Sequence, residues 1–155
     1  MATVENNFSH LICWVGSLDL KSAKDRVIDG PITATLRALE SSITQVLLLS
    51  NFSADDNDVF IEWLRRVTPV DIVLAWNRPG MSPVNYRAIH DAEKTVLVRY
   101  AHLGNRVAIL LSPGTPQMQS VWLLLAKTYF PAMLLLSSSV QKGVEQVDLP
   151  FQIAA

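Results

Sequence analysis

The sequence lacks an excess of charge of either sign. Thirteen Lys and Arg residues are balanced by fourteen Asp and Glu residues, which gives a formal net charge of −1. Proteins that bind duplex nucleic acid or a membrane surface through a broad basic field carry many more cations than anions. The balance excludes those two classes, so an anionic ligand would have to be held by groups at one local site.

Cysteine and metal-binding motifs are also scarce. The single cysteine, Cys13, cannot form an internal disulfide, and no close spacing of Cys and His residues resembles a zinc site. We therefore expect a cytoplasmic location, no structural metal and no cofactor. The acidic group Asp55, Asp56 and Asp58 lacks the later glycine and glutamate of a calcium loop, so capping of a helix is the favoured interpretation.

Motifs for membrane insertion, nucleotide binding and catalysis are missing as well. No apolar run approaches the roughly 18 residues of a membrane helix, and the first residues lack the order of a signal peptide. The sequence has neither a Walker A loop nor a G-x-G-x-x-G after its first expected strand, and it has no G-x-S-x-G elbow. We therefore expect no membrane partner and no catalytic residues.

The composition that is present indicates a well-packed domain. Half of the 155 residues are hydrophobic, 17% are charged, and the mean hydropathy is +0.25. A chain of this length can bury a sizeable core and suits a single domain, here residues 1–155. The low charge predicts that part of the surface is covered by a partner or a neighbouring domain.

Short apolar runs alternate with longer segments of helical period from about residue 10 onwards. The expected helices carry apolar stripes over residues 32–43, 60–67, 83–103 and 118–129. The expected parallel strands cover residues 10–15, 45–50, 70–75, 106–112 and 131–137, and residues 144–153 follow a polar turn as an antiparallel strand. This order predicts an α/β fold, a Rossmann-like three-layer α/β/α sandwich with about five parallel strands and a C-terminal antiparallel strand.

The expected helix 118–129 is apolar on nearly all sides. It contains Val121, Trp122, Leu123, Leu124 and Leu125 in succession. A helix of this kind must be covered on nearly all sides, by the sheet and other elements or by a second copy of the protein. The favoured interpretation is partial burial in a homodimer.

The loops that follow the expected parallel strands are rich in small polar residues. In an open parallel sheet, ligands bind beyond the carboxyl ends of the strands, where the strand order reverses. The candidate ligand-binding residues are therefore Gly16, Ser17, Asp19, Asn51, Asn77, Arg78, Ser112, Gly114, Thr115, Pro116, Gln117 and Met118.

The fourth of these loops has the features of an anion site. Gly114 permits a tight turn, Thr115 is a good N-cap, and Pro116 suits the first position of a helix. The amides of residues 117–119 would then face a phosphate, although a plain strand-to-helix turn explains the same residues equally well. Ser17 and Asp19 are expected to contact ribose hydroxyls or base edges, and Arg78 is the single cation of these loops.

Three motifs together resemble the CARF domains, the CRISPR-associated Rossmann fold sensors. They are WVGSLD after the first strand, LSPGTPQM after the fourth, and WLLLAKTYFPAMLLLSSS beyond it. The sequence is most similar to the amino-terminal sensory domains of RtcR-type regulators, which control RNA-repair operons with sigma-54 RNA polymerase. It departs from many CARF domains at residues 113–116, which are Pro-Gly-Thr-Pro instead of Gly-Gly-Thr-Lys. The residues that carry the similarity are Gly114, Thr115, Trp122, Leu123, Leu124, Ala126, Pro131, Ala132, Ser137 and Ser138.

This resemblance implies a regulatory function. It predicts a homodimer whose paired domains form one pocket for an RNA-derived nucleotide, either cyclic oligoadenylate or RNA with a terminal cyclic phosphate. The chain would be the amino-terminal part of a longer sigma-54-dependent transcriptional activator with an AAA+ effector. Two alternatives remain open, a ring nuclease that cleaves cyclic oligoadenylate and a dimerisation module with a vestigial pocket.

Overall fold

Six strands form one sheet in the computed structural model, which describes residues 7–139 and 141–150. The order of the strands across the sheet is β3-β2-β1-β4-β5-β6, and every neighbouring pair is parallel except β5 and β6. The strands are β1 His10–Trp14, β2 Gln45–Ser50, β3 Asp71–Asn77, β4 Val107–Leu110, β5 Leu134–Ser139 and β6 Gly143–Gln146.

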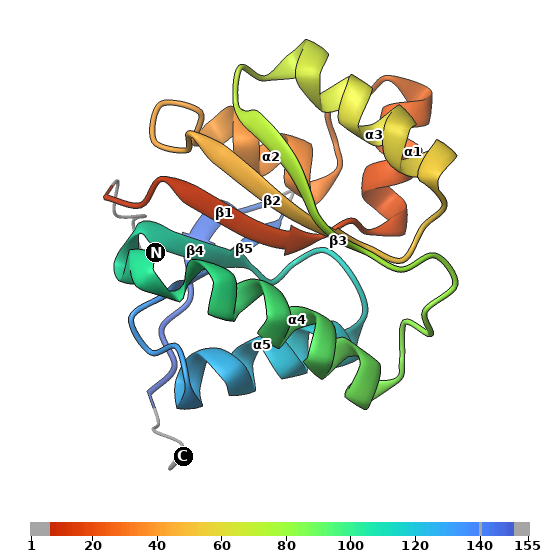
Figure 1. Cartoon of the computed structure of the whole chain (residues 1–155). Helices are drawn as coiled ribbons and strands as arrows, with labels where there is room; N and C mark the ends of the chain where they lie inside the picture. The colour runs from red at the N-terminus through yellow and green to blue at the C-terminus, as the bar shows by residue number, and fades with distance from the viewer. Residues whose placement is uncertain (1–6, 140, 151–155) are drawn as a thin grey trace.

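Helices cover both faces of this sheet (Figure 1). On one face lie α1 Ser17–Asp25, α2 Pro31–Ala38 and α3 Ala54–Val67, and on the other lie α4 Tyr86–Tyr100 and α5 Pro116–Thr128. A 3₁₀ helix, η1 Ala101–Arg106, follows α4. None of the helices in the described residues is both long enough and apolar enough to cross a bilayer. The predicted three-layer α/β sandwich is confirmed.

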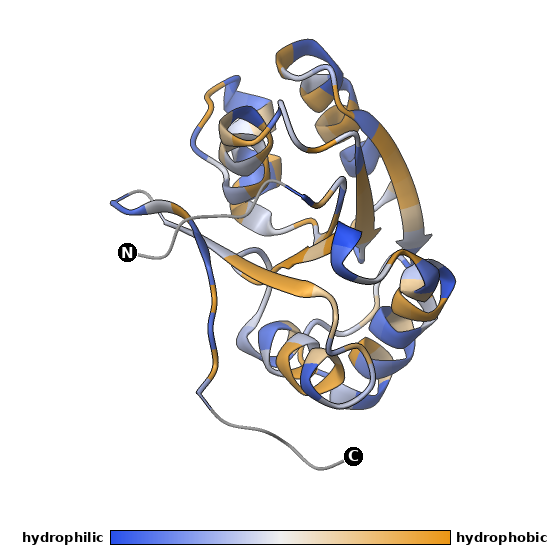
Figure 2. Cartoon of the chain, turned by 90° about the vertical axis from the view of Figure 1, so that its left-hand side faces the viewer, coloured by the Kyte–Doolittle hydropathy of each residue, from blue (hydrophilic) through white to orange (hydrophobic). Residues whose placement is uncertain are grey.

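The strands owe their burial to alternating side chains on two hydrophobic faces. Ile12 and Trp14 of β1 pack with α4 and α5, whereas Leu11 and Cys13 pack with α1, α2 and α3. All four side chains are fully buried. Figure 2 shows hydrophobic strands between helices of mixed hydropathy, as expected for parallel strands covered on both faces.

The predicted first helical segment was wrong in its extent. Two helices connect β1 to β2: α1 begins directly after Gly16, and α2 ends at Ala38. Leu39 is the C-cap of α2, and Ile43 is buried outside any helix, although both residues fit the apolar spacing. Leu39 and Ile43 are therefore apolar because they pack against the core of the domain, and not because they lie on one face of a helix.

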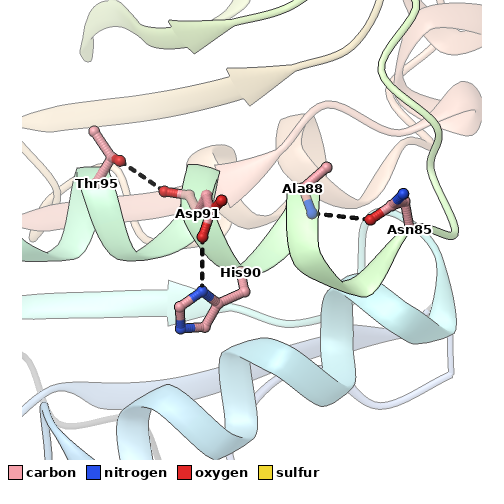
Figure 3. Close-up of polar contacts among 5 residues, drawn as sticks. All are labelled: Asn85, Ala88, His90, Asp91 and Thr95. Atoms are coloured by element: carbon pink, nitrogen blue, oxygen red, sulfur yellow. Dashed lines mark hydrogen bonds and ion pairs between the residues drawn. The ribbon is translucent and has the colours of Figure 1, made fainter.

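The third helix starts later than predicted. Asn85 is its N-cap and accepts a hydrogen bond from the Ala88 amide at 3.0 Å, so Pro83 and Val84 precede the helix (Figure 3). Tyr86, within the predicted apolar stripe of residues 83–103, is 57% exposed because it lies at the first helical position, beyond the edge of the core. The helix ends at Tyr100, and η1 takes up the remaining residues.

Several strand ends also differ from the predictions. β3 continues to Asn77 because one extra residue, Ala75, is accommodated where its register with β2 shifts. β4 and β5 are shorter at their starts than predicted. Residues 138 and 139, which were predicted to lie in the polar turn after the fifth strand, belong to β5 and pair with β6. The antiparallel β6 is confirmed but ends at Gln146, and residues 151–153 of the prediction lie outside the described residues.

Most of the apolar surface of α5 is buried within the chain itself. Met118, Val121, Trp122, Leu125 and Ala126 are buried against the sheet and α4. Among the large apolar residues of α5 and its C-cap, only Leu124 and Tyr129 are more than half exposed. The composition of α5 is therefore explained mainly by its own domain, and the homodimer stays a prediction.

A buried carboxyl group links α4 to β1. Trp14 Nε1 donates a hydrogen bond to Glu93 Oε2 at 2.7 Å, and both side chains are fully buried. Burial raises the pKa of Glu93 from its ordinary value of 4.5 to about 10, although the bond from Trp14 acts in the opposite direction. Glu93 is therefore a neutral acid at pH 7, which suits its apolar surroundings.

We predict that the free energy of unfolding falls as the pH rises from 5 to 9. The folded state keeps a proton on Glu93 that the unfolded state releases above pH 4.5, so this contribution is complete below that pH and is lost toward pH 10. Glu93→Gln, which keeps a neutral acceptor for Trp14, should flatten the decline, whereas the exposed Glu40→Gln should not. Urea unfolding across this pH range measures both effects, and equal declines in all three proteins would contradict the prediction.

Candidate functional site

A cavity of about 400 Å³ lies at the carboxyl ends of β1 and β4. The order of the sheet reverses between these two strands, because the chain leaves β1 toward β2 and later returns to β4 on the other side. This is the position at which parallel α/β sheets bind ligands. The structure brings eight predicted residues to the cavity: Gly16, Ser17, Asp19, Asn51, Ser112, Gly114, Thr115 and Met118.

Four predicted residues do not line this cavity. Asn77 is the last residue of the outer strand β3, and Arg78 lines a different cavity of about 300 Å³ in the connection from β3 to α4. Pro116 and Gln117 lie in the first turn of α5, next to the cavity. Asn77 and Arg78 lie apart from this cavity because β3, at the edge of the sheet, carries them away from the β1/β4 boundary.

The start of α5 has the predicted cap. The Thr115 hydroxyl accepts a hydrogen bond from the Met118 amide at 3.3 Å, and Pro116 occupies the first helical position. The Thr115 carbonyl accepts from the Gln119 amide at 3.1 Å. Two of the three amides predicted to hold a phosphate are therefore already paired, and the predicted seat at residues 117–119 was wrong in this respect. Among the described residues, the Gln117 amide forms no hydrogen bond.

The start of α1 provides the amides that α5 lacks. Its N-cap is Gly16, which has no side chain to accept hydrogen bonds from the first turn. Within the described ranges, no hydrogen bond engages the amides of Ser17, Leu18 or Asp19. Because these residues line the cavity, the positive end of α1 is directed to the same space as that of α5. The helical spacing of Leu20 and Ala23 after Gly16 was the sequence signal for this helix.

Glycine permits the two helix starts to approach each other. A Cβ atom on Gly16 would lie 3.1 Å from the Gly114 amide nitrogen and 3.2 Å from Asp19 Oδ2. Gly114 itself has a φ of +96°, and a Cβ atom there would lie 2.7 Å from Met118 Sδ. Glycine is therefore favoured at position 16 by the close contact and at position 114 by its backbone conformation.

Asp19 organises the site and is not placed to read a ligand. Its Oδ2 accepts a hydrogen bond from the Gly16 amide at 3.0 Å, and its Oδ1 accepts from the Ile32 amide at 2.9 Å. The side chain is fully buried although it borders the cavity. Burial raises the pKa of Asp19 to about 7, and the hydrogen bonds from Ile32 and Gly16 oppose that rise. The predicted contact of Asp19 with ribose or base edges is therefore replaced by a link between the starts of α1 and α2.

Side-chain hydrogen bonds hold the neighbouring connections around the cavity. Asn51 Nδ2 donates to the Met81 carbonyl at 3.0 Å, and Thr115 Oγ1 donates to the Pro83 carbonyl at 2.6 Å. The connection from β3 to α4 is thereby attached at two points. Pro83 and Pro31 line the cavity from segments outside the four predicted loops, and no pattern in the sequence pointed to either contact.

The polar groups on the exposed face of α4 belong to a different surface. His90 Nδ1 lies 3.0 Å from Asp91 Oδ1, and Thr95 donates to the Asp91 carbonyl (Figure 3). None of these residues lines the cavity. In the described part of the chain, no group of three or more His, Cys, Asp or Glu residues is placed to hold a metal ion.

The described lining of the cavity contains no Lys or Arg. Its one acidic residue, Asp19, is buried behind the helix starts. Electrostatic attraction for an anion must therefore come from backbone amides and the two helix dipoles. The arrangement suits a phosphate group flanked by uncharged portions of a ligand.

We predict that Gly114→Ala destabilises the fold more than Gly80→Ala. Both glycines have positive φ, +96° and +82°, so each alanine costs roughly 1–2 kcal/mol of backbone strain. Only at position 114 does the new methyl group meet a side chain, and Met118 must move from its present position to admit it, which adds to the cost. Nothing lies within 4 Å of the corresponding position at Gly80. Urea denaturation compares the two variants, and an equal loss of stability would contradict the close contact at Gly114.

Comparisons with known proteins bear on the fold. No protein-family model matches the sequence, and no curated protein matches it. The solved structures that are similar to the chain include two with bound cyclic adenylate ligands. One is Csm6 from Enterococcus italicus bound to cyclic hexa-2'-fluoro-hexa-dAMP, with a TM-score of 0.64 and 16% identity over 88% of this chain and 34% of that chain.

The second similar structure is Can2 from Sulfobacillus thermosulfidooxidans in complex with cyclic tetra-adenylate, with a TM-score of 0.55 and 12% identity over 93% of this chain and 38% of that chain. The chain thus spans little more than a third of the length of each protein. This likeness agrees with the fold that the resemblance of the sequence to CARF domains implied. The chain therefore shares the Rossmann-like α/β fold of the matched parts of these two structures.

Proposed function

We propose that this chain is a ligand-sensing domain that binds cyclic oligoadenylate between the starts of α1 and α5. The observation that carries the proposal is the cavity at the β1/β4 boundary, where the start of α1 presents amides that no described residue pairs and the Gln117 amide of α5 lies next to them. The likeness to two structures that hold cyclic adenylate ligands supports this ligand class over other phosphates.

The amides of Ser17, Leu18 and Gln117 are suited to hold the phosphodiester groups of such a ring. A charge-assisted hydrogen bond contributes about 1.5–3 kcal/mol, and each helix start adds the favourable field of its dipole. Because no Lys or Arg lines the described cavity, we expect binding to depend only weakly on salt concentration.

The size of the cavity favours a homodimer. About 400 Å³ lies at the lower end of the range for small-molecule sites, so one chain accommodates part of a cyclic tetranucleotide and not the whole ring. A ring of four identical nucleotides has two-fold symmetry, which matches the symmetry of a C₂ dimer. Two chains would therefore contribute equivalent half-sites to one ligand.

The regulatory context follows from the sequence resemblance. We infer that the domain is the amino-terminal sensor of a cytoplasmic sigma-54-dependent activator and controls an AAA+ effector elsewhere in a longer protein. The similarity of Gly114, Thr115, Trp122 and Ser137 to RtcR-type sensors supports this context. Under this proposal RNA with a terminal cyclic phosphate is the competing ligand, because it presents the same phosphate chemistry.

We predict that Ser17→Pro weakens the binding of cyclic tetraadenylate much more than Ser17→Ala. Proline removes the amide hydrogen, whereas alanine removes only the hydroxyl. Position 17 is the first of α1, where proline fits, and Gly16 has the extended conformation, with φ −98° and ψ 166°, that a following proline requires. Loss of one charge-assisted bond should lower the affinity roughly tenfold or more in isothermal titration calorimetry.

The same titrations distinguish the alternatives. Melting curves establish that both variants remain folded. If Ser17→Pro and Ser17→Ala bind the ring as well as the wild type does, the amide has no role and the proposed phosphate contact is wrong. Chromatography of the ring after incubation separates a sensor from a ring nuclease, since linear products would show cleavage.

A further inference from the structure

A second cavity, of about 420 Å³, lies beside the first one. It is enclosed by the start of α1, by α2, and by the carboxyl end of β5 with the beginning of β6. Leu18 and Pro31 line both cavities and form the wall between them. The two spaces are therefore adjacent parts of one edge of the molecule.

The ends of β4 and β5 keep the two cavities side by side. These strands are parallel neighbours, so their carboxyl ends reach the same edge of the sheet. Ser112, which follows β4 and lines the first cavity, accepts a hydrogen bond from the amide of Ser138, which lines the second. The relative position of the cavities is thus set by the sheet and not by a loose connection.

Leu18 lines both cavities and is therefore placed to contact a ligand at the boundary between them. Its side chain is 50% exposed, and within the described chain its amide in the first turn of α1 is unpaired. A phosphate held by this amide would lie at the boundary between the cavities. The two nucleosides joined by that phosphate would then extend in opposite directions, one toward each cavity.

We propose that the second cavity is a purine-base subsite of the cyclic oligoadenylate. Ile28, Ala34, Ala38 and Val144 provide apolar walls for the faces of the base. Asp29 and Ser138 also line the cavity, and no hydrogen bond or ion pair of the described residues engages the Asp29 carboxylate or the Ser138 hydroxyl. An adenine edge offers an amino donor for the carboxylate and a ring nitrogen that accepts from the hydroxyl.

This inference rests on the proposed function, because the second cavity is assigned to the same ligand. It adds to that function a reason for base selectivity. The first cavity holds phosphate through amides, which all nucleotides satisfy equally, whereas the second has the apolar walls and few polar groups that distinguish one base from another.

The test is to fill the second cavity and leave the amides unchanged. Ala34→Leu and Ala38→Leu each add a branched side chain from α2 into it, and neither residue lines the first cavity. Ala54→Leu, an exposed alanine at the first position of α3 that lines neither cavity, is the matched control. Calorimetry with cyclic tetraadenylate should show roughly tenfold or greater weakening for the two α2 variants and none for the control, since a stacked base contributes about 1–3 kcal/mol.

Each outcome decides between the proposals. Melting curves show whether each variant is folded, and the exposed position of Ala38 keeps the test usable if Ala34→Leu is unstable. If the wild type and both α2 variants bind the ring equally, the base subsite is wrong while the proposed function stands. If the wild type binds neither cyclic tetraadenylate nor cyclic hexaadenylate, the proposed function and the subsite fail together.

Discussion

The close contact between the starts of α1 and α5 is the constraint on which the site depends. A Cβ atom on Gly16 would lie 3.1 Å from the Gly114 amide nitrogen, so the β1–α1 and β4–α5 connections are in close contact at this glycine, and Gly114 supplies the positive φ of the second connection. The two helix dipoles consequently point into one cavity at the place where the strand order reverses. The fold thereby creates a positive local field without using a cation.

Two buried carboxyl groups link the elements around this contact through hydrogen bonds. Asp19 joins the starts of α1 and α2 by accepting from Gly16 and Ile32, and Glu93 attaches α4 to Trp14 of β1. Trp14 in turn lies beneath Gly114, where a Cβ atom would be 3.5 Å from the Trp14 Cβ atom. Burial raises the pKa of both carboxyl groups, so neither adds a full negative charge beside a bound phosphate at neutral pH.

The sequence predicted the three layers, the mostly parallel sheet with its antiparallel C-terminal strand, and the capped start of α5. The Thr115 cap and Pro116 were identifiable because helix capping is a local property of a few neighbouring residues. The start of α1 was missed because glycine at the N-cap gives no side-chain signal, and Gly16 was interpreted as part of a loop. The contribution of Pro31 and Pro83 was beyond prediction, since it depends on how distant connections pack over the cavity. The position of Arg78 beside a different cavity could not be predicted for the same reason, since it depends on where the edge strand β3 lies in the sheet.

The most direct test of the proposed function is native mass spectrometry of the purified protein with cyclic tetraadenylate, cyclic hexaadenylate and an RNA that ends in a cyclic phosphate. We predict a species containing two chains and one intact adenylate ring, formed in preference to any complex with the RNA. A folded protein that takes up no ring at any ratio, or that binds the RNA alone, would contradict the proposal.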